Sequence, residues 1–356
     1  MRQFHPLTVV GKTSETRDSV RLALAVPSAL RPAFEFLPGQ HLPVRCSLAG
    51  TELRRTYSIC SAPGSWPLEI GVRVQPGGAF SEFARDELKV GDALDVMPPF
   101  GQFHANIDSA GARRMHLAFA AGSGITPVLS IISAILSTEP ESQVCLFYGN
   151  RRQATTMFID DLYALKNRYP DRLQLHFVFS REEQEFSIAA GRLDADKVRE
   201  LWHAFCTDMP IDEVYVCGPD TMIDSVRGAL VELGVAPGHI HAERFGVPRK
   251  RQSKAPLPVA DGSVANVTVI MDGHKKRFTM EASDENIVDA AAQHGIELPF
   301  SCKGGVCATC RCHLQSGRVD MAVNYGLEPW ELEQGFILAC QSRPVSDELV
   351  LDYDRA

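Results

Sequence analysis

Four cysteines lie close together near the C-terminus, in the stretch CKGGVCATCRC from Cys302 to Cys312, and Cys340 follows in ILACQS. Cys302, Cys307 and Cys310 have the spacing C-x4-C-x2-C of the plant-type 2Fe–2S loop, whose fourth ligand lies further along the chain. Thiolates are soft anionic ligands that suit iron, and four of them offset the charge of two ferric ions. The spacing therefore predicts a 2Fe–2S cluster held by Cys302, Cys307, Cys310 and Cys340.

Two questions concern the same loop. A structural zinc site usually pairs two short Cys/His knuckles, whereas here the distal Cys340 stands alone, which disfavours zinc. Cys312 is a further candidate ligand, but we expect it to be a small buried residue of the following strand, because free cysteine often packs as a small hydrophobe. Gly304 and Gly305 lack a β-carbon, so they can take positive φ and direct amide hydrogens at cluster sulfur.

Two stretches in the middle of the chain join an apolar strand to a helix and are candidate ligand sites. In AGSGITP, Gly122 and Gly124 would let a phosphate approach the amides of a helix N-terminus. The stretch lacks the third glycine of G-x-G-x-x-G, and Arg151 and Arg152 stand after the next strand where an acidic residue is expected. A plain tight turn explains these glycines as well.

The second stretch, CGPDTM, places Cys217 at the carboxyl end of a strand, where open α/β sheets bind ligands. Taken singly, Cys217 is better explained as a buried core residue.

The first hundred residues offer two more candidates. In LRRTYSICS, Arg55 and Tyr57 share one face of a strand. An arginine can grip a phosphate and a tyrosine can stack on a flat ring. GGAFS, residues 77–81, offers flexible amides and a hydroxyl at a helix start, a second phosphate cradle. Each stretch is also compatible with ordinary strand and turn.

The elements that must position these residues change character along the chain. Residues 1–110 contain short strands, near 20–26, 41–46, 55–60 and 68–74, broken by Pro and Gly, which suggests an antiparallel barrel or sandwich. Residues 111–246 alternate apolar strands with amphipathic helices, which predicts βαβ units and a parallel sheet. Residues 247–263 read as a solvated linker.

Residues 264–356 read as a separate unit. We expect a hairpin turning at Asp272-Gly273, and a helix that Ser283 caps and Gly295 ends. This segment has 14 acidic and 8 basic residues, so it carries most of the net charge of −8.

Composition excludes some classes of function. The chain is 45% hydrophobic and 22% charged, which is typical of a globular protein, and its net negative charge argues against nucleic-acid binding. We see no apolar signal segment and no stretch long enough to span a membrane. We therefore expect a cytoplasmic protein whose ten cysteines are ligands, reactive thiols or core residues rather than disulfides.

Several of these motifs occur together in one known family. R-x-Y-S at 55–58, G-G-x-F-S at 77–81, G-S-G-I-T-P at 122–127 and C-G-P at 217–219 have the order seen in ferredoxin–NADP reductase-type flavoproteins, and the ferredoxin loop follows. The resemblance covers essentially the whole chain. Within the family, the stretches ELRRTYSIC, ERF, CKGGVCATC and NYGLEPWELEQGFILACQ resemble the reductase subunits of phenylacetyl-CoA epoxidase complexes.

The resemblance implies three domains: an antiparallel FAD-binding β-barrel, a parallel α/β NADP-binding domain and a β-grasp 2Fe–2S ferredoxin domain. It implies that Arg55 holds the FAD diphosphate, Tyr57 stacks on the isoalloxazine and Ser58 lies near its N5 atom. The other cofactor-binding residues that we assign are Gly77, Gly78, Ser81, Gly122, Gly124, Thr126, Arg151, Cys217 and Gly218. Ser58, Cys217 and Glu243 are the expected catalytic residues, and Phe245 is expected near the flavin.

The nucleotide is expected to be NADPH rather than NADH. Ser180 and Arg181 follow the third strand of the α/β domain, where this family reads the adenosine 2′-phosphate. A guanidinium there suits a dianionic phosphate, although a solvated surface arginine is the simpler alternative.

The resemblance implies a reductase that passes electrons from NADPH through FAD and the 2Fe–2S cluster to the oxygenase subunits of a multicomponent di-iron monooxygenase, the phenylacetyl-CoA ring epoxidase. The nearest alternative changes the client to another ring-hydroxylating di-iron or Rieske oxygenase, or to a steroid hydroxylase. Two other classes are a zinc-stapled interaction module on a flavoprotein and a redox sensor whose cluster signals without turnover.

Overall fold

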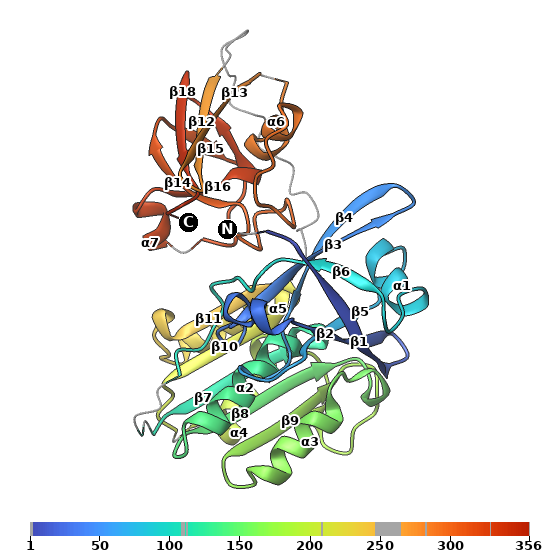
Figure 1. Ribbon diagram of the computed structural model, residues 1–356. Coiled ribbons are helices and arrows are strands. Elements are labelled where there is room, and N and C mark those ends of the chain that lie inside the picture. Colours follow the sequence, from blue (N-terminus) through green and yellow to red (C-terminus); the bar gives the residue numbers. More distant parts are fainter. Residues whose placement is uncertain are drawn as a thin grey trace. The chain divides into compact units, whose positions relative to one another are not determined.

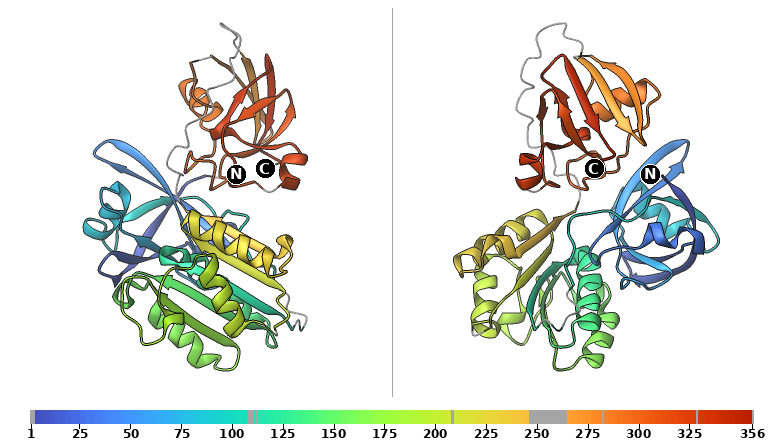
Figure 2. Two further views of the ribbon diagram at one scale, coloured as in Figure 1. Left: turned by 180° about the vertical axis from the view of Figure 1, so that it is seen from behind. Right: turned by 60° about the vertical axis from the view of Figure 1, so that its left-hand side comes forward.

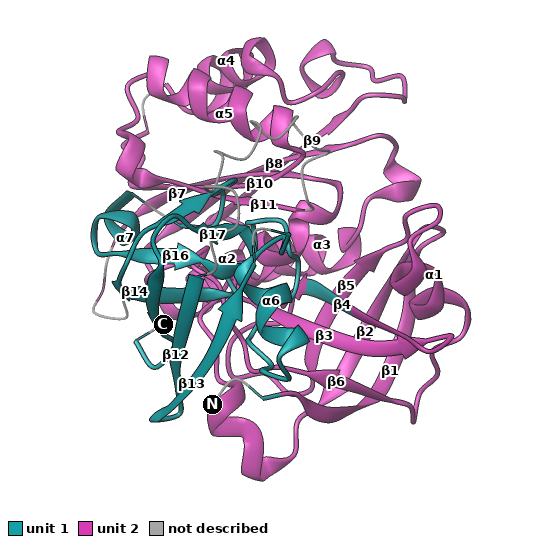
Figure 3. Ribbon diagram, turned by 90° about the horizontal axis from the view of Figure 1, so that it is seen from above, with its two compact units in different colours: residues 1–3, 54–56, 246–356 teal, residues 4–53, 57–245 magenta. Residues whose placement is uncertain are grey.

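The computed structural model describes residues 3–107, 111, 113–207, 209–245, 265–281, 283–327 and 329–355. The chain divides into two compact units (Figure 3). One unit comprises Phe4–Leu53 and Tyr57–Phe245, and the other comprises Met1–Gln3, Arg54–Thr56 and Gly246–Ala356. The predicted linker at 247–263 lies outside the described residues. The predicted boundary between residues 110 and 111 falls inside the unit that contains Tyr57–Phe245, and it stays a prediction.

The N-terminal part of the chain forms a six-stranded antiparallel sheet in the order β4-β3-β6-β1-β2-β5 (Figure 1). Its strands are β1 (His5–Thr16), β2 (Ser19–Ala25), β3 (His41–Leu48), β4 (Thr51–Ser58), β5 (Leu68–Arg73) and β6 (Ala93–Val96). In β1, Leu7 and Val9 are buried while Pro6 and Thr8 are exposed, as expected of a strand with one face on a core.

Residues next to the two edge strands close this sheet into a barrel. Ile59, which follows β4, forms an antiparallel bridge with Ile70 of β5. The amide of Cys60 also donates to the carbonyl of Glu69 at 2.9 Å. The edges β4 and β5 are thereby joined, and the predicted barrel is confirmed. The helix α1 (Ala79–Asp86) begins directly after Gly78.

The next part of the chain forms a five-stranded parallel sheet in the order β11-β10-β7-β8-β9. Its strands are β7 (Met115–Ala121), β8 (Gln143–Asn150), β9 (Leu173–Phe179), β10 (Glu213–Gly218) and β11 (Ile240–Arg244). The intervening helices are α2 (Ile125–Thr138), α3 (Ile159–Arg168), α4 (Ala195–Phe205) and α5 (Asp220–Glu232). The predicted alternation of strands and helices is confirmed, and β11 is an additional strand that the sequence did not reveal.

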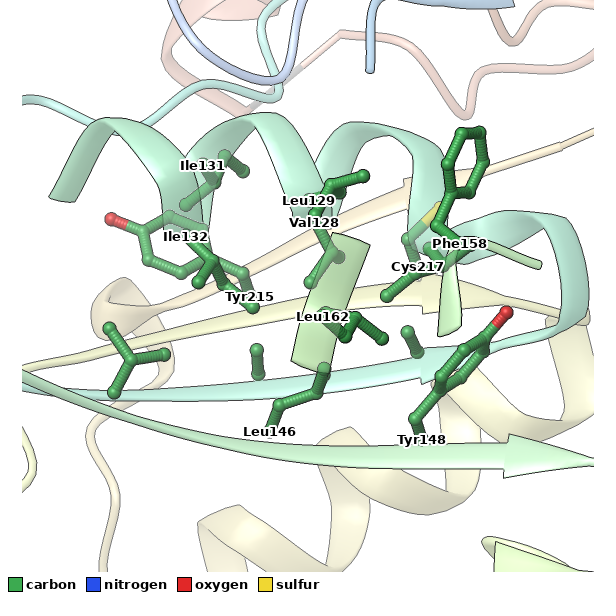
Figure 4. Close-up of a cluster of buried hydrophobic side chains, with 14 of the residues drawn as sticks. Val128, Leu129, Ile131, Ile132, Leu146, Tyr148, Phe158, Leu162, Tyr215 and Cys217 are labelled. Atoms are coloured by element: carbon green, nitrogen blue, oxygen red, sulfur yellow. The ribbon is translucent and has the colours of Figure 1, made fainter. Parts of the chain in front are cut away.

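Helices cover both faces of the parallel sheet (Figure 2). Buried residues of α2 and α3 share one core with the sheet, and those of α4 and α5 share another. Figure 4 shows the first core, where Val128 and Ile132 of α2 lie over Leu146 of β8 and Tyr215 of β10. Strands covered on both sides read as continuous apolar runs, which is why β7 has the sequence MHLAFAA.

The C-terminal unit contains a five-stranded mixed sheet in the order β13-β12-β18-β14-β16 and a two-stranded sheet of β15 and β17. The strands are β12 (Ala265–Met271), β13 (His274–Met280), β14 (Arg311–Ser316), β15 (Val319–Met321), β16 (Phe336–Leu338), β17 (Ser342–Pro344) and β18 (Glu348–Asp352). The predicted turn is confirmed: Asp272 and Gly273 both have positive φ, 55° and 73°, as a type I′ hairpin requires.

One predicted helix cap in this unit is wrong. The helix α6 (Ile287–Gln293) is capped by Asn286, whose side chain accepts the amide hydrogen of Asp289 at 3.0 Å. Ser283 lies three residues before Asn286, too early to reach the first turn. The predicted helix end is confirmed, because Gly295 has φ 70° and its amide donates to the carbonyl of Ala292. A last short helix, α7 (Pro329–Glu333), precedes β16. Over the described part of the chain, no helix has both the length and the apolar surface needed to cross a bilayer.

Candidate functional site

A cavity of about 1090 Å³ lies beyond the carboxyl ends of the parallel strands. Its walls come from residues at or after every strand of the sheet: Gly122 after β7, Arg151 after β8, Ser180 after β9, Gly218 at the end of β10, and Phe245 after β11. Strands β7 and β10 are neighbours, and the helices that follow them lie on opposite faces. The cavity therefore lies at a topological switch point, where open α/β sheets bind their ligands.

The turn between β7 and α2 is built from glycine for two different reasons. Gly122 has φ 55°, a conformation that disfavours a side chain. Gly124 has ordinary helical dihedrals, but a β-carbon there would lie 2.1 Å from the carbonyl oxygen of Cys217. Both glycines line the cavity. The backbone of the turn is thus open to a ligand on one side and pressed against β10 on the other.

Thr126, another predicted cofactor residue, points into the protein. It is buried, its hydroxyl donates to the carbonyl of Ser123 at 3.0 Å, and its methyl carbon lies where a β-carbon on Gly71 of β5 would clash. In the structure Thr126 shapes the start of α2 and its contact with the barrel. Its role toward a nucleotide stays a prediction.

The cavity brings together the predicted basic residues and one that the sequence did not single out. Arg181 donates its amide to the carbonyl of Arg151 at 2.9 Å, so the ends of β8 and β9 carry two arginines side by side. Ser180 and Arg192 line the same cavity. All three arginine side chains are exposed. Arg192 could not be identified from sequence because it lies in an irregular loop before α4, without any motif around it.

The three predicted catalytic residues also meet. Ser58 at the end of β4 lies with its hydroxyl 3.4 Å from Glu243 Oε2, within donating distance. Cys217 of β10 pairs with Glu243 of β11 in the sheet register. Burial, and secondarily the charge of Glu243, raises the pKa of the Cys217 thiol well above its usual range. Cys217 is therefore a neutral thiol beside a carboxylate and not a thiolate nucleophile.

A fourth residue, His41 of β3, joins this group. Its Nδ1 lies 3.4 Å from Glu243 Oε1, its side chain is 5% exposed, and its Nε2 is buried without a hydrogen-bond partner. The two oxygens of Glu243 thus face different partners, His41 and Ser58. In the sequence His41 was only the first residue of a strand after FLPGQ, and nothing in the strand pattern distinguished it.

The predicted FAD residues lie on β4 and at the start of α1. Arg55 is exposed, and its Nη1 donates to the carbonyl of Arg54 at 2.7 Å. The half-buried ring of Tyr57 lies 5.2 Å from that of Phe80. Arg55 and Tyr57 are two residues apart on the strand, so they share a face. A guanidinium and an aromatic ring are groups suited to the diphosphate and the flat ring of FAD, and the roles of Arg55 and Tyr57 toward FAD stay predictions.

The GGAFS stretch forms a tight turn whose polar groups bond within it. The Ser81 hydroxyl donates to the carbonyl of Gly78 at 2.9 Å and accepts the amide hydrogen of Gln75 at 3.1 Å. Gly77 has φ 75°, and its amide donates to Glu82 Oε1 at 2.9 Å. A β-carbon on Gly78 would lie 2.5 Å from the Ser81 hydroxyl. The glycines are therefore required by the turn itself, and the roles of Gly77, Gly78 and Ser81 toward a phosphate stay predictions.

The cysteine loop directs hydrogen-bond donors at sulfur. The Sγ of Cys302 accepts the amide hydrogens of Gly304 at 3.3 Å and of Cys307 at 3.4 Å. The Thr309 hydroxyl donates to Cys307 Sγ at 3.2 Å. The contact with Cys307, aided by these amides, lowers the pKa of Cys302 to about 5. The same contact raises the pKa of Cys307 well above its usual range, so this pair of thiols favours one thiolate, the form that binds metal.

Backbone conformation in this loop agrees only in part with the expectation for its glycines. Gly305 has φ 73°, and positive φ is also found at Lys303 and Ala308, both at 50°. Gly304 contributes its amide without adopting positive φ.

The four predicted ligands form two contacting pairs, Cys302 with Cys307 and Cys310 with Cys340. Among the residues that the structure describes, no three Cys, His, Asp or Glu side chains converge on a single metal position. A structural zinc ion needs four ligands around one point, whereas a 2Fe–2S cluster takes two thiolates at each of two irons. The paired donor set fits the 2Fe–2S cluster.

Cys312 has a different environment from these four. It lies in β14, is completely buried, and pairs with Ile337 of β16 in the register. Burial raises the pKa of its thiol to about 12, and Tyr353 lies in contact with it. This agrees with the expectation of a small buried strand residue.

Three family models match the chain. The model "Oxidoreductase FAD-binding domain" matches residues 6–105, "Oxidoreductase NAD-binding domain" matches residues 119–228, and "2Fe-2S iron-sulfur cluster binding domain" matches residues 269–345.

The chain is also similar to curated proteins and solved structures along its whole length. It is 44% identical over 354 residues to a subunit of the 1,2-phenylacetyl-CoA epoxidase of Escherichia coli (strain K12), covering 99% of both chains. It is 33% identical to the ferredoxin reductase component of 3-ketosteroid-9-alpha-monooxygenase of Rhodococcus rhodochrous, covering 98% of this chain and 96% of the relative. The structure of phthalate dioxygenase reductase matches with a TM-score of 0.59 and 25% identity, covering 98% of both chains.

The cavity at the switch point, the group around Glu243 and the paired thiols thus lie within a chain that matches these proteins over its whole length. The chain belongs to the FAD- and NAD-binding oxidoreductases with a C-terminal 2Fe–2S domain, the reductase family in which the matching 1,2-phenylacetyl-CoA epoxidase subunit is also found.

Proposed function

We propose that this chain is the NADPH-dependent reductase component of a multicomponent di-iron monooxygenase, and that its client is a phenylacetyl-CoA ring epoxidase. The observation that carries the proposal is the presence, in one chain, of a nucleotide-sized cavity at a switch point and a paired thiol site for a 2Fe–2S cluster. The client follows from the 44% identity to a subunit of such an epoxidase over 99% of both chains. Electrons would pass from nicotinamide to flavin, to the cluster and on to the oxygenase.

Bound FAD supplies the chemistry that connects a two-electron hydride donor to a one-electron acceptor. The residues of the chain would bind the FAD and orient its ring. Arg55 would hold the diphosphate, and Tyr57, braced by Phe80, would present its ring to the isoalloxazine. No side chain has to act as a general acid or base for the electrons to move.

Glu243 and the three residues around it, Ser58, His41 and Cys217, would keep their side chains in fixed positions near the flavin. The Glu243 carboxylate accepts from Ser58 and faces His41, so the hydroxyl proton of Ser58 has a fixed direction. Cys217 retains its proton because burial raises its pKa. A neutral thiol adds no second negative charge beside Glu243.

Preference for NADPH would come from the arginines of the cavity. Arg151, Arg181 and Arg192 come from three separate segments and line one cavity, which Ser180 also lines. A 2′-phosphate is a dianion, and guanidinium groups bind phosphate with paired hydrogen bonds. NADH lacks that phosphate and would not form these contacts with the arginines.

The experiment that tests the function is reconstitution with purified oxygenase subunits. The protein, phenylacetyl-CoA and the di-iron subunits of a phenylacetyl-CoA epoxidase are mixed with NADPH, and nucleotide oxidation is compared with epoxide formed. We expect the amount of NADPH oxidised to be nearly equal to the amount of epoxide formed. With the oxygenase of a 3-ketosteroid monooxygenase in place of the epoxidase subunits, we expect little product. The reverse result would assign a different client. Zinc in place of iron in the purified protein would overturn the electron chain itself, and equal kcat/KM for NADH and NADPH would remove only the nucleotide preference.

A further inference from the structure

The short helix α7 holds a fully buried carboxylate. The side chain of Glu331 is 0% exposed, whereas its neighbours Trp330 and Leu332 are 49% and 42% exposed. Glutamate is almost never fully buried unless it is paired. Its Oε1 lies 2.7 Å from Nε of Arg311, at ion-pair distance. The inward face of α7 is therefore anchored by charge.

Arg311, which pairs with this carboxylate, directly follows a cluster ligand in the chain. Arg311 is the residue after Cys310, and its side chain is 9% exposed. The guanidinium carbon lies 3.7 Å from the centre of the Phe336 ring. Arg311 is thus held between an aromatic face and Glu331, and its charge cannot turn away into solvent.

The same ion pair spans the chain segment that carries the fourth ligand. From α7 the chain runs through Phe336–Leu338 of β16 to Cys340. Arg311 pairs with Leu338 in the register of β14 and β16, and the amide of Ala339 donates to the carbonyl of Cys310 at 3.2 Å. The Arg311–Glu331 contact therefore connects the segment that starts at α7 and ends at Cys340 to the residue that follows Cys310.

We infer that the buried charges of Arg311 and Glu331 act on the reduction potential of the 2Fe–2S centre in opposite directions, Arg311 because it directly follows the ligand Cys310 in the chain and Glu331 because it is paired with Arg311. Reduction adds one negative charge to the centre, so a nearby cation favours the reduced form and a nearby anion disfavours it. Water screens buried charges only weakly. Glu331 acts through Arg311 and is a positioning residue. The inference concerns the cluster alone and does not depend on the nucleotide or the client.

The test compares two charge-neutralising changes on the same helix in the full chain. Glu331→Gln removes the buried anion, and Glu333→Gln removes an exposed one. The potential is measured by anaerobic dye titration, following the electron paramagnetic resonance signal of the reduced cluster. We expect Glu331→Gln to favour reduction by about tenfold, which is about 59 mV for one electron. We expect Glu333→Gln to change the equilibrium by less than about twofold, because exposed charges are screened.

A double change keeps the inference testable if Glu331→Gln loses the cluster. Arg311→Gln/Glu331→Gln removes both charges, so neither group is left buried without its partner, and the variant is expected to retain iron. Because the two charges act in opposite directions, its one-electron reduction equilibrium is expected to lie within about twofold of that of the unmodified protein. Arg311→Gln alone is expected to disfavour reduction. Equal shifts for Glu331→Gln and Glu333→Gln would overturn the inference. So would a double variant that binds no iron, or one whose potential follows either single change.

Discussion

The carbonyl oxygen of Cys217 occupies the space that a β-carbon on Gly124 would need, since the two would lie only 2.1 Å apart. The start of α2 is thereby held against the end of β10, next to the cavity that Gly124 lines. Gly124 has helical dihedrals and no positive φ, so the requirement for glycine is one of space and not of backbone conformation.

Gly124→Ala is expected to weaken nucleotide binding and to destabilise the protein. The added methyl group must push the helix start away from β10, and overpacking of this kind costs about 1–3 kcal/mol. Thermal unfolding and the Kd for NADP⁺ measure the two effects. The control is Gly228→Ala in α5, where a β-carbon meets nothing within 4 Å. That change is expected to stabilise by about 0.5–1 kcal/mol, because alanine is a better helix former. Unchanged stability and affinity in Gly124→Ala would contradict the close contact.

A second prediction concerns Arg21 of β2, which is surrounded by carboxylates from two strands and a helix. Its guanidinium contacts Glu15 at 2.6 Å, Glu69 at 3.4 Å, and Asp161 of α3. Arg21→Met leaves three carboxylates without their cation and is expected to cost about 3 kcal/mol, near the low end for breaking a buried pair because the side chain is 20% exposed. Chemical denaturation measures the loss. Arg199→Met, which breaks exposed pairs on α4, is expected to change nothing measurable.

The loss in Arg21→Met is expected to depend on pH. Burial already raises the pKa of Glu69, and Arg21 opposes that rise. Without Arg21 the folded protein binds protons more readily than the unfolded chain, so stability falls as pH rises through the folded pKa. The variant should therefore be closest to the unmodified protein near pH 5 and furthest from it near pH 8. A difference that does not vary over this range would mean that the carboxylates do not interact through Arg21.

The sequence predicted the features whose signal is local. The spacing of Cys302, Cys307 and Cys310, the Asp272-Gly273 turn and the apolar run of β7 each indicate one structure by themselves. Strand β1 was missed because its second half is rich in Thr, Ser, Lys and Glu, so the apolar alternation ends early. Strand β11 was missed because it is short and lies at a sheet edge.

The sequence did not predict features that depend on tertiary contact. His41 and Glu243 are 202 residues apart and meet only because β3 and β11 come together. Arg192 reaches the cavity through an irregular loop, and no spacing rule connects it to Arg151 or Arg181. Ser and Asn are both favoured at the N-cap position, so residue type alone could not distinguish Ser283 from Asn286. The choice depends on where the first turn begins, which packing decides.

A third prediction tests the nucleotide preference. Arg181→Gln and Arg192→Gln are each expected to raise KM for NADPH by about 10- to 100-fold, the effect of losing a charged hydrogen bond worth about 1.5–3 kcal/mol. KM for NADH should change little, because NADH has no 2′-phosphate. The control is Arg152→Gln, since Arg152 is exposed beside Arg151 but does not line the cavity. If Arg192→Gln raises KM for NADPH and for NADH equally, Arg192 contacts a part of the nucleotide that is common to both.

The last prediction separates Cys312 from the cluster ligands. Cys312→Ala removes a buried thiol that packs between β14 and β16, so it should leave a small void and cost about 1–2 kcal/mol. The iron content and the visible spectrum of the cluster should not change. Cys340→Ser, in contrast, removes half of the Cys310–Cys340 pair and should leave the protein with little or no iron. Loss of the cluster in Cys312→Ala, at a temperature where the variant is still folded, would show that the fourth ligand had been assigned to the wrong cysteine.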